Sequence, residues 1–137
     1  MVERINKREG KILARDELKR ALDELKGAEI LQDNGLYFKS VVSSYYSVYH
    51  EAKAALLLKG VIPRSHEYVE RMFNLYYVKT SELGIDTGKI IGRLMKLREE
   101  ADYYPESVFR LEDSREALGL AKSFVEAIQG KLGESLT

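Results

Sequence analysis

The sequence predicts an all-α protein, an antiparallel up-and-down bundle of four to five helices. Apolar residues recur every three or four positions through most of the 137 residues, which is the helical period, and only 2 prolines interrupt them. No segment alternates polar and apolar residues for long enough to indicate a strand. The hydrophobic fraction of 45% fits one globular domain, so residues 1–137 are expected to form a single helical unit.

The first two helices are predicted between residues 14 and 60. Residues 1–11 are mostly charged and are expected to be a frayed lead-in or an early extension of the first helix. From Ala14 the apolar spacing is helical, and Gly35 suits the left-handed residue that closes a helix. A second helix runs from near Leu36 to Gly60, and its apolar face is wide enough to contact several neighbours. We therefore expect it to be the central helix.

A third helix is predicted to begin after Ser65, a favourable N-cap, and to end at Gly84. A fourth is capped by Asp86 or Thr87 and ends near Tyr103, because Pro105 disfavours a helical Tyr104. Within it, Gly88 and Gly92 are expected to permit close approach of another helix rather than to cradle a phosphate.

The fifth helix is predicted to follow the connection from Pro105 to Glu112. Asp113 with Glu116 resembles a capping box that opens this helix, which runs to Leu132. Residues 133–137 are expected to be a tail.

Composition narrows the classes of function. The absence of cysteine excludes thiolate sites and fits a reducing cytoplasm, where we expect the protein. The apolar run from Ala54 to Leu58 is too short to cross a bilayer. Lysine plus arginine equals aspartate plus glutamate at 22 each, so no general electrostatic attraction to nucleic acid is indicated. No Glu-x-x-His tetrapeptide occurs, and we expect neither a metal site nor a required cofactor.

Two groups of residues are candidates for chemistry. Arg98 and Asp102 are one turn apart and can pair, either as a structural ion pair or as part of a site. Around the turn before the third helix lie Lys59, Arg64 and His66, which we expect to contact a phosphate or a nucleotide. The structural alternative for His66 is an exposed helix-start residue, and for His50 a histidine hydrogen-bonded inside the bundle.

Several segments, taken together and in order, resemble the HEPN domain family: SYYSVYHEAKAAL at residues 44–56, Arg64-Ser65-His66, and REEADY at residues 98–103. The resemblance implies a bundle that pairs as a two-fold dimer and is often encoded beside a minimal nucleotidyltransferase. Many members are metal-independent RNases with an Arg-x4-6-His motif, and such pairs often act as toxin and antitoxin. In the motif the histidine transfers a proton and the arginine steadies the charge on the phosphate.

The sequence departs from that motif. Tyr103, Tyr104 and Pro105 occupy the positions where the histidine belongs, and a tyrosine with a pKa near 10 is a poor general base. A histidine from another helix, His50 or His66, would have to complete the pair. We expect that His50 facing Arg98 would favour an enzyme, and that His50 buried elsewhere would favour a binding module.

Three hypotheses follow. The favoured one is a HEPN module that partners a minimal nucleotidyltransferase and can also bind a nucleotide, without strong catalysis of its own. The alternative is a metal-independent RNase toxin using Arg98 with Asp102, Tyr103 or a histidine from another helix, with RNA as its partner molecule. The third is a purely structural bundle. Dimerisation is expected from the resemblance and from the aromatic excess at Phe73, Tyr76 and Tyr77.

Overall fold

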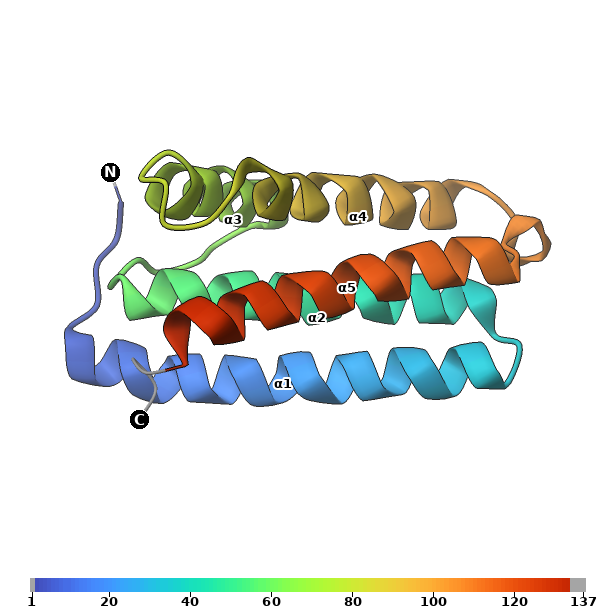
Figure 1. Ribbon diagram of the computed structural model, residues 1–137, viewed down its shortest axis with the longest axis horizontal. Coiled ribbons are helices and arrows are strands. Elements are labelled where there is room, and N and C mark those ends of the chain that lie inside the picture. The colour runs from blue at the N-terminus through green and yellow to red at the C-terminus, as the bar shows by residue number, and fades with distance from the viewer. Residues whose placement is uncertain (1, 134–137) are drawn as a thin grey trace.

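The computed structural model describes residues 2–133, and in these residues the protein is an all-α bundle, as predicted (Figure 1). The five main helices are α1 (Lys7–Asp33), α2 (Tyr37–Leu58), α3 (His66–Phe73), α4 (Ile85–Tyr103) and α5 (Leu111–Leu132). A π-helical turn, η1 (Asn74–Val78), continues α3, and a 3-10 turn, η2 (Glu106–Val108), precedes α5. The predicted tail, from residue 134 onward, lies outside the described residues.

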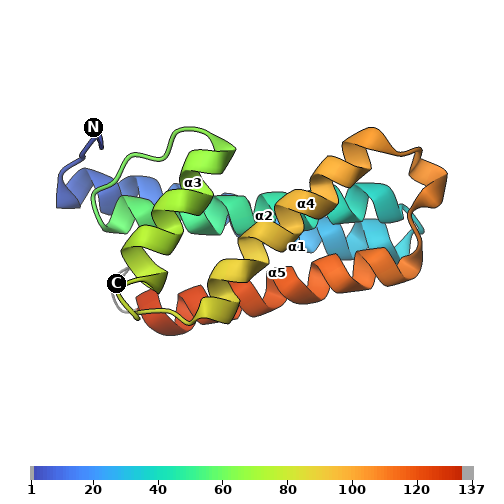
Figure 2. The same ribbon diagram turned by 90° about the horizontal axis from the view of Figure 1, so that it is seen from above.

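Helix α2 is the central helix. Helices α1, α2 and α5 run along the long axis, while α3 and α4 form a second layer above α2 (Figure 1). Seen from above, α3 and α4 splay apart, and the beginning of α3 lies over the middle of α2 (Figure 2). Helix α2 contacts each of the other four, which confirms the role predicted from its wide apolar face. Helix α2 therefore contacts the helices of both layers.

The α1–α2 contact is built from small residues. Ala14, Ala21 and Ala28 recur every seven positions on α1 and are fully buried. From α2, the Ser40 hydroxyl donates to the carbonyl of Ala28 at 2.7 Å, and the Ser47 hydroxyl donates to that of Ala21 at 2.8 Å. The small side chains let the two helices approach closely, and the two serine hydrogen bonds fix the register of α1 against α2.

Phe73 and Tyr77 fill the core of the bundle. Both are fully buried, and the Tyr77 hydroxyl donates to the carbonyl of Ala55 at 2.5 Å. Tyr76 is half-buried beneath the guanidinium of Arg4. The inference that these aromatics exceed what one protomer can bury is therefore wrong for Phe73 and Tyr77, and dimerisation stays a prediction that rests on the resemblance.

Several predicted helix boundaries are confirmed. Gly35 and Gly60 both have a left-handed backbone at φ +76°. The Ser65 hydroxyl accepts a hydrogen bond from the amide of Tyr68 at 3.2 Å, as expected of an N-cap. The early extension of the first helix is also found, because α1 begins at Lys7, where the side chain of Asn6 caps it.

Three boundaries differ from the predictions. The third helix ends at Phe73 and passes into η1 instead of continuing to Gly84. Gly84 is extended and is itself the N-cap of α4, which places Asp86 in the first turn, where the helix dipole favours a carboxylate. Asp113 is the third residue of α5, and its carboxylate accepts from the amide of Arg110 at 2.8 Å. Asp113 therefore lies in the first turn of α5 and binds the amide of the N-cap residue, Arg110. The predicted N-caps of α4 and α5 are both wrong.

Gly88 and Gly92 allow α4 to approach α3 and η1, as predicted. A Cβ at Gly88 would overlap the amide oxygen of Asn74 and lie 2.8 Å from Val78 Cγ2. A Cβ at Gly92 would lie 3.1 Å from Glu70 Oε2. Among the described residues, no helix combines the length and the apolar character needed to span a membrane.

The N-terminal segment fixes the loop that leads to α3. The amide of Ile5 donates to the carbonyl of Gly60 at 2.9 Å, and that of Ile62 donates to Glu3 at 3.1 Å. An antiparallel bridge joins Arg4 and Val61. This pairing holds residues 61–62 against the N-terminal segment, so the loop that leads to α3 has a fixed path.

Candidate functional site

Three tyrosines of α2 meet the first residue of α3. The hydroxyl of Tyr45 and Nδ1 of His66 are hydrogen-bonded at 2.5 Å. The imidazole of His66 also stacks on the ring of Tyr49, with centroids 4.3 Å apart and planes 19° apart, and it contacts Tyr46 edge-on. Because Tyr45 and Tyr49 are four residues apart on one helix face, their rings flank the same imidazole.

Arg98 approaches this group from α4. Its guanidinium carbon lies 5.3 Å from the ring centroid of Tyr45 and 5.8 Å from that of Tyr46, within the range of a cation–π interaction. Its Nη2 lies 3.9 Å from Asp102 Oδ2, so the predicted contact one turn apart is confirmed, although it is long for an ion pair. The arginine side chain stays 26% exposed and can reach a ligand.

On the α1 side, Glu17 binds two side chains of α2. Glu17 Oε2 lies 2.6 Å from Nδ1 of His50, and Oε1 lies 3.2 Å from Nζ of Lys53. Lys53 Nζ also lies 5.0 Å from the ring centroid of Tyr49. His50 contacts Tyr46 and Tyr49. The tyrosine–histidine cluster is defined as the five rings that contact one another here: Tyr45, Tyr46, Tyr49, His50 and His66.

The surroundings hold His66 neutral. Burial lowers the pKa of His66, and the positive charges of Arg98 and Lys53 lower it further. Burial raises the pKa of the Tyr45 phenol against the opposing charge of Arg98, so that phenol keeps its proton. For Glu17, burial would raise the pKa, but the hydrogen bonds from His50 and Lys53 and the charge of Lys53 outweigh it and lower the pKa. At neutral pH the site thus contains a neutral imidazole beside an ionised carboxylate and two cations.

This combination suits a phosphodiester. A neutral imidazole can accept a proton, and a guanidinium and an ammonium can stabilise negative charge that develops on phosphate oxygens. The ring of Tyr46, which is partly exposed, can stack on a base. Among residues 2–133, no group of three histidine, aspartate or glutamate side chains is arranged to hold a metal ion.

His66, and not His50, is the histidine on the side of Arg98. The charge of Arg98 acts directly on the pKa of His66, and both residues contact Tyr45 and Tyr46. His50 lies against Glu17 at the opposite edge of the cluster. By the criterion stated for His50, its position away from Arg98 favours a binding module, but His66 lies where that criterion required His50 to be.

Lys59 and Arg64 are not brought together with His66. The ammonium of Lys59 pairs with Glu82 and lies 4.6 Å from the ring centroid of Tyr77. Arg64 pairs with Glu3 of the N-terminal segment. The left-handed turn at Gly60 and the extended chain after it direct these two side chains away from the cluster. A nucleotide contact by Lys59 or Arg64 stays a prediction, and such a contact would not be shared with His66.

Tyr103 lies outside the cluster. It is 88% exposed at the end of α4, where it lines a surface hollow of about 510 Å³. The other lining residues are Lys96, Glu99, Glu100, Asp102 and Tyr104. A catalytic role for Tyr103, proposed from the motif position, stays a prediction without a contact to support it.

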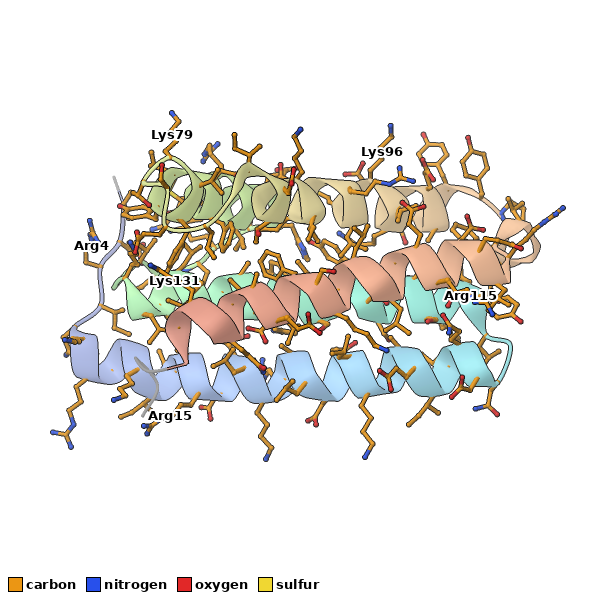
Figure 3. All side chains as sticks on the ribbon, viewed as in Figure 1. Arg4, Arg15, Lys79, Lys96, Arg115 and Lys131 are labelled. Carbon is orange, nitrogen blue, oxygen red and sulfur yellow. The ribbon has the colours of Figure 1, made fainter. Side chains whose placement is uncertain are left out.

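Glu17 and Lys53 were missed by sequence analysis. Lys53 follows His50 by three residues, which puts both on one face of α2 and gave a usable signal. Glu17 gave none, because it is one of several charged residues on α1 and only the α1–α2 register brings it to His50. Basic side chains elsewhere, such as Arg15 on α1 and Lys96 on α4, point to different sides of the molecule (Figure 3).

Comparisons with known proteins agree with the fold. The HEPN domain family model matches residues 14–131. "Putative toxin MJ0605" of Methanocaldococcus jannaschii is 36% identical over 116 residues, covering 85% of this chain and 86% of that protein. A "UPF0332 protein" of Thermotoga maritima is 31% identical over 118 residues, covering 86% of this chain and 89% of its own length.

A solved structure supports the architecture. The crystal structure of TT1696 from Thermus thermophilus superposes with a TM-score of 0.76 at 20% sequence identity. The match covers 87% of this chain and 98% of that one. With the family match over most of the chain, the bundle organised around α2 has an assignment: the protein belongs to the HEPN domain family.

Proposed function

We propose that this protein is an RNA-cleaving toxin that works without a metal ion at the tyrosine–histidine cluster. The observation that carries the proposal is the position of His66, hydrogen-bonded to Tyr45 beneath the guanidinium of Arg98. In the Arg-x4-6-His motif, the arginine and the histidine lie close together in the sequence. Here Arg98 comes from α4 and His66 from α3. The name of the M. jannaschii relative, "Putative toxin MJ0605", supports the same class of function.

The reaction is an internal transesterification. Neutral His66 takes the proton of the ribose 2′-hydroxyl, and the 2′-oxygen attacks the adjacent phosphorus. The bond from phosphorus to the 5′-oxygen breaks, and that oxygen leaves with a proton. The products are a 2′,3′-cyclic phosphate and a 5′-hydroxyl, with no change of oxidation state. Arg98 and Lys53 stabilise the added negative charge on the phosphate, a contribution that removal of one such donor commonly reveals as a rate loss of about 10²–10³.

For this step His66 uses the nitrogen that Tyr45 leaves open. When the Nδ1–H of His66 donates to the phenol oxygen, the lone pair of Nε2 is available as a base. His66 remains partly exposed, so a ribose hydroxyl can reach it. Tyr45 therefore orients the base rather than reacting itself.

The second candidate, which is the hypothesis favoured on sequence alone, is a module without strong catalysis of its own that partners a minimal nucleotidyltransferase and can bind a nucleotide. The observation in its favour is that stacked rings next to Arg98 and Lys53 also suit binding of a nucleotide without cleavage. The two candidates share one surface and differ in whether the bound phosphodiester is cut.

The proposal includes a partner. Toxins of this class require neutralisation, and family membership supports a minimal nucleotidyltransferase as the antitoxin, a homodimeric toxin, and a cytoplasmic location. Co-purification of the tagged protein from its native host, followed by mass spectrometry and sedimentation, tests all but the location. Recovery of only a monomer without such a partner would contradict this part of the proposal.

The catalytic part is tested with 5′-labelled single-stranded RNA in excess EDTA. We expect wild type to cleave the RNA and to leave the DNA of the same sequence intact, because DNA lacks the 2′-hydroxyl. Arg98→Ala should reduce the rate by roughly 100-fold or more. Arg93→Ala is the matched control, since Arg93 lies on the same helix but pairs with Glu116 at 2.7 Å. RNA that binds and stays intact would support the nucleotide-binding candidate instead.

A further inference from the structure

The second histidine of the cluster has a place in the same reaction. We propose that His50, held by Glu17, is the general acid that protonates the leaving 5′-oxygen, while His66 acts as the base. The scissile phosphate then lies between two imidazoles, over the rings of Tyr46 and Tyr49. This inference rests on the proposed function and assigns the proton that the cleavage step requires.

The two histidines share the same neighbours. The ring centroid of Tyr49 lies 5.6 Å from that of His50 and 4.3 Å from that of His66, so the two imidazoles are separated by no more than the sum of these distances. The ring centroid of Tyr46 lies 6.4 Å from that of His50 and 6.0 Å from that of His66. Both imidazoles therefore border the same two tyrosine rings, so a phosphodiester bound over these rings would have one imidazole on each side.

Glu17 gives His50 a fixed orientation. Its carboxylate accepts from Nδ1 of His50 at 2.6 Å, and the two side chains are only 14% and 16% exposed. This hydrogen bond commits Nδ1 to the protein and leaves Nε2 for the substrate. A carboxylate behind an imidazole also stabilises the imidazolium, which is the form that can donate a proton. Glu17 is therefore a positioning residue that acts through His50.

The two histidines are placed in opposite electrostatic surroundings. His66 is partly buried near Arg98 and Lys53, whose positive charges favour its neutral form. His50 touches the carboxylate of Glu17, to which Lys53 is also bound, and its ring contacts those of Tyr46 and Tyr49. One imidazole beside cations and another beside a carboxylate are the arrangement expected of a base and an acid.

The step balances. His66 gains the proton of the 2′-hydroxyl as the 2′-oxygen bonds to phosphorus. The Nε2 proton of the His50 imidazolium goes to the 5′-oxygen as its bond to phosphorus breaks. After the products leave, exchange with water returns a proton to His50 and removes one from His66, so the site is restored.

Two substrates with different leaving groups distinguish a general acid from a general base. Uridine 3′-(4-nitrophenyl phosphate) releases 4-nitrophenolate, which leaves without protonation, whereas RNA needs an acid. We expect His50→Gln to slow RNA cleavage by about 10²–10⁴-fold and to slow the aryl ester less than tenfold. His66→Ala should slow both substrates. With RNA, the bell-shaped pH–rate profile of wild type should lose its basic limb in His50→Gln.

Glu17→Gln tests the positioning role of Glu17. Like His50→Gln, it should slow the cleavage of RNA more than that of the aryl ester, but by a smaller factor. Glu29→Gln is the matched control on α1, because Glu29 pairs with Lys122 outside the site at 2.9 Å. Equal slowing of both substrates by His50→Gln, or no slowing of either, would overturn the inference while leaving the proposed function intact. A wild-type protein that cleaves neither substrate would overturn both.

Discussion

The phenol oxygen of Tyr45 and Nδ1 of His66 lie 2.5 Å apart, and this hydrogen bond ties the central helix to the first residue of α3. Tyr45→Phe removes the hydroxyl and keeps the ring, which is 1% exposed. Because His66 loses the partner that orients it, we expect RNA cleavage to fall about tenfold or more. Thermal or denaturant unfolding should show a loss of about 1 kcal/mol, the usual net contribution of one hydrogen bond.

Tyr68→Phe is the control for Tyr45→Phe. The Tyr68 hydroxyl is buried, and among the described residues it has no hydrogen-bond partner. Removing it should leave stability unchanged or slightly raised and should leave cleavage unchanged. Equal effects of the two substitutions would contradict the role given to the Tyr45 hydroxyl.

Arg98→Met should raise the pKa of His66. Burial is the larger cause of the lowered pKa and remains in the variant, so the value should move up but stay below that of an exposed histidine. Titration of the imidazole carbon-bound protons by NMR measures the shift, and His50 is distinguished from His66 with a His50→Gln background. Arg93→Met should leave the pKa of His66 unchanged, and an equal shift in both variants would argue against a direct effect of Arg98.

Glu51 should make stability fall as pH rises. It is fully buried on α2, neither carboxylate oxygen has a hydrogen-bond partner among the described residues, and burial raises its pKa to about 8 from the ordinary value of 4.5. Between these two pH values the folded state holds a proton that the unfolded state has lost, so the free energy of unfolding decreases as pH rises from 4.5 to about 8. Above that range the folded state carries a buried charge.

Glu51→Gln removes the titrating group. We expect it to abolish this pH dependence and to raise stability around pH 8 by roughly 1–3 kcal/mol, since the buried amide retains part of the polar cost. Urea unfolding at a series of pH values measures the slope, with the exposed Glu126→Gln as the control. An unchanged slope in Glu51→Gln would mean that the carboxylate is not protonated in the fold.

Gly88→Ala should destabilise the α4 contact. The added methyl would overlap Asn74 and press on Val78 Cγ2 at 2.8 Å, which we expect to cost about 1–3 kcal/mol. Gly119→Ala is the matched change in α5, where nothing lies within 4 Å of the new Cβ. There the helix propensity of alanine should raise stability by roughly 0.5–1 kcal/mol. Melting temperatures that move in the same direction for both would contradict the close packing of α4.

The sequence was sufficient to predict the helices, because in each of them the apolar residues recur with the helical period. It predicted the central role of α2, the N-cap at Ser65 and the close approach at Gly88. It failed at the starts of α4 and α5, where Gly84 and Arg110 occupy the cap positions although acidic residues nearby are better cap formers. Those acidic residues lie inside the first turn, where they interact with the helix dipole. The residue preferences alone do not distinguish an N-cap position from a first-turn position.

The site was only partly predictable. The tyrosines of α2 and the contact between Arg98 and Asp102 follow from helical spacing. The position of His66 depends on the loop between α2 and α3, which turns at Gly60 and pairs with the N-terminal segment. No sequence pattern specifies that geometry. For the same reason Lys59 and Arg64 were grouped with His66 by sequence proximity, although they pair elsewhere. Glu51 was overlooked as an ordinary charge in a helix, and only its burial identifies it.

The central claim is that His66 supplies the base that the linear motif lacks. The measurement that tests it is the rate of RNA cleavage in EDTA by His66→Ala, with and without added imidazole. We predict a loss of roughly 100-fold or more that imidazole partly restores, because the free base can occupy the space beside Tyr49 and accept the 2′-hydroxyl proton. Cleavage by His66→Ala at the wild-type rate would contradict the account.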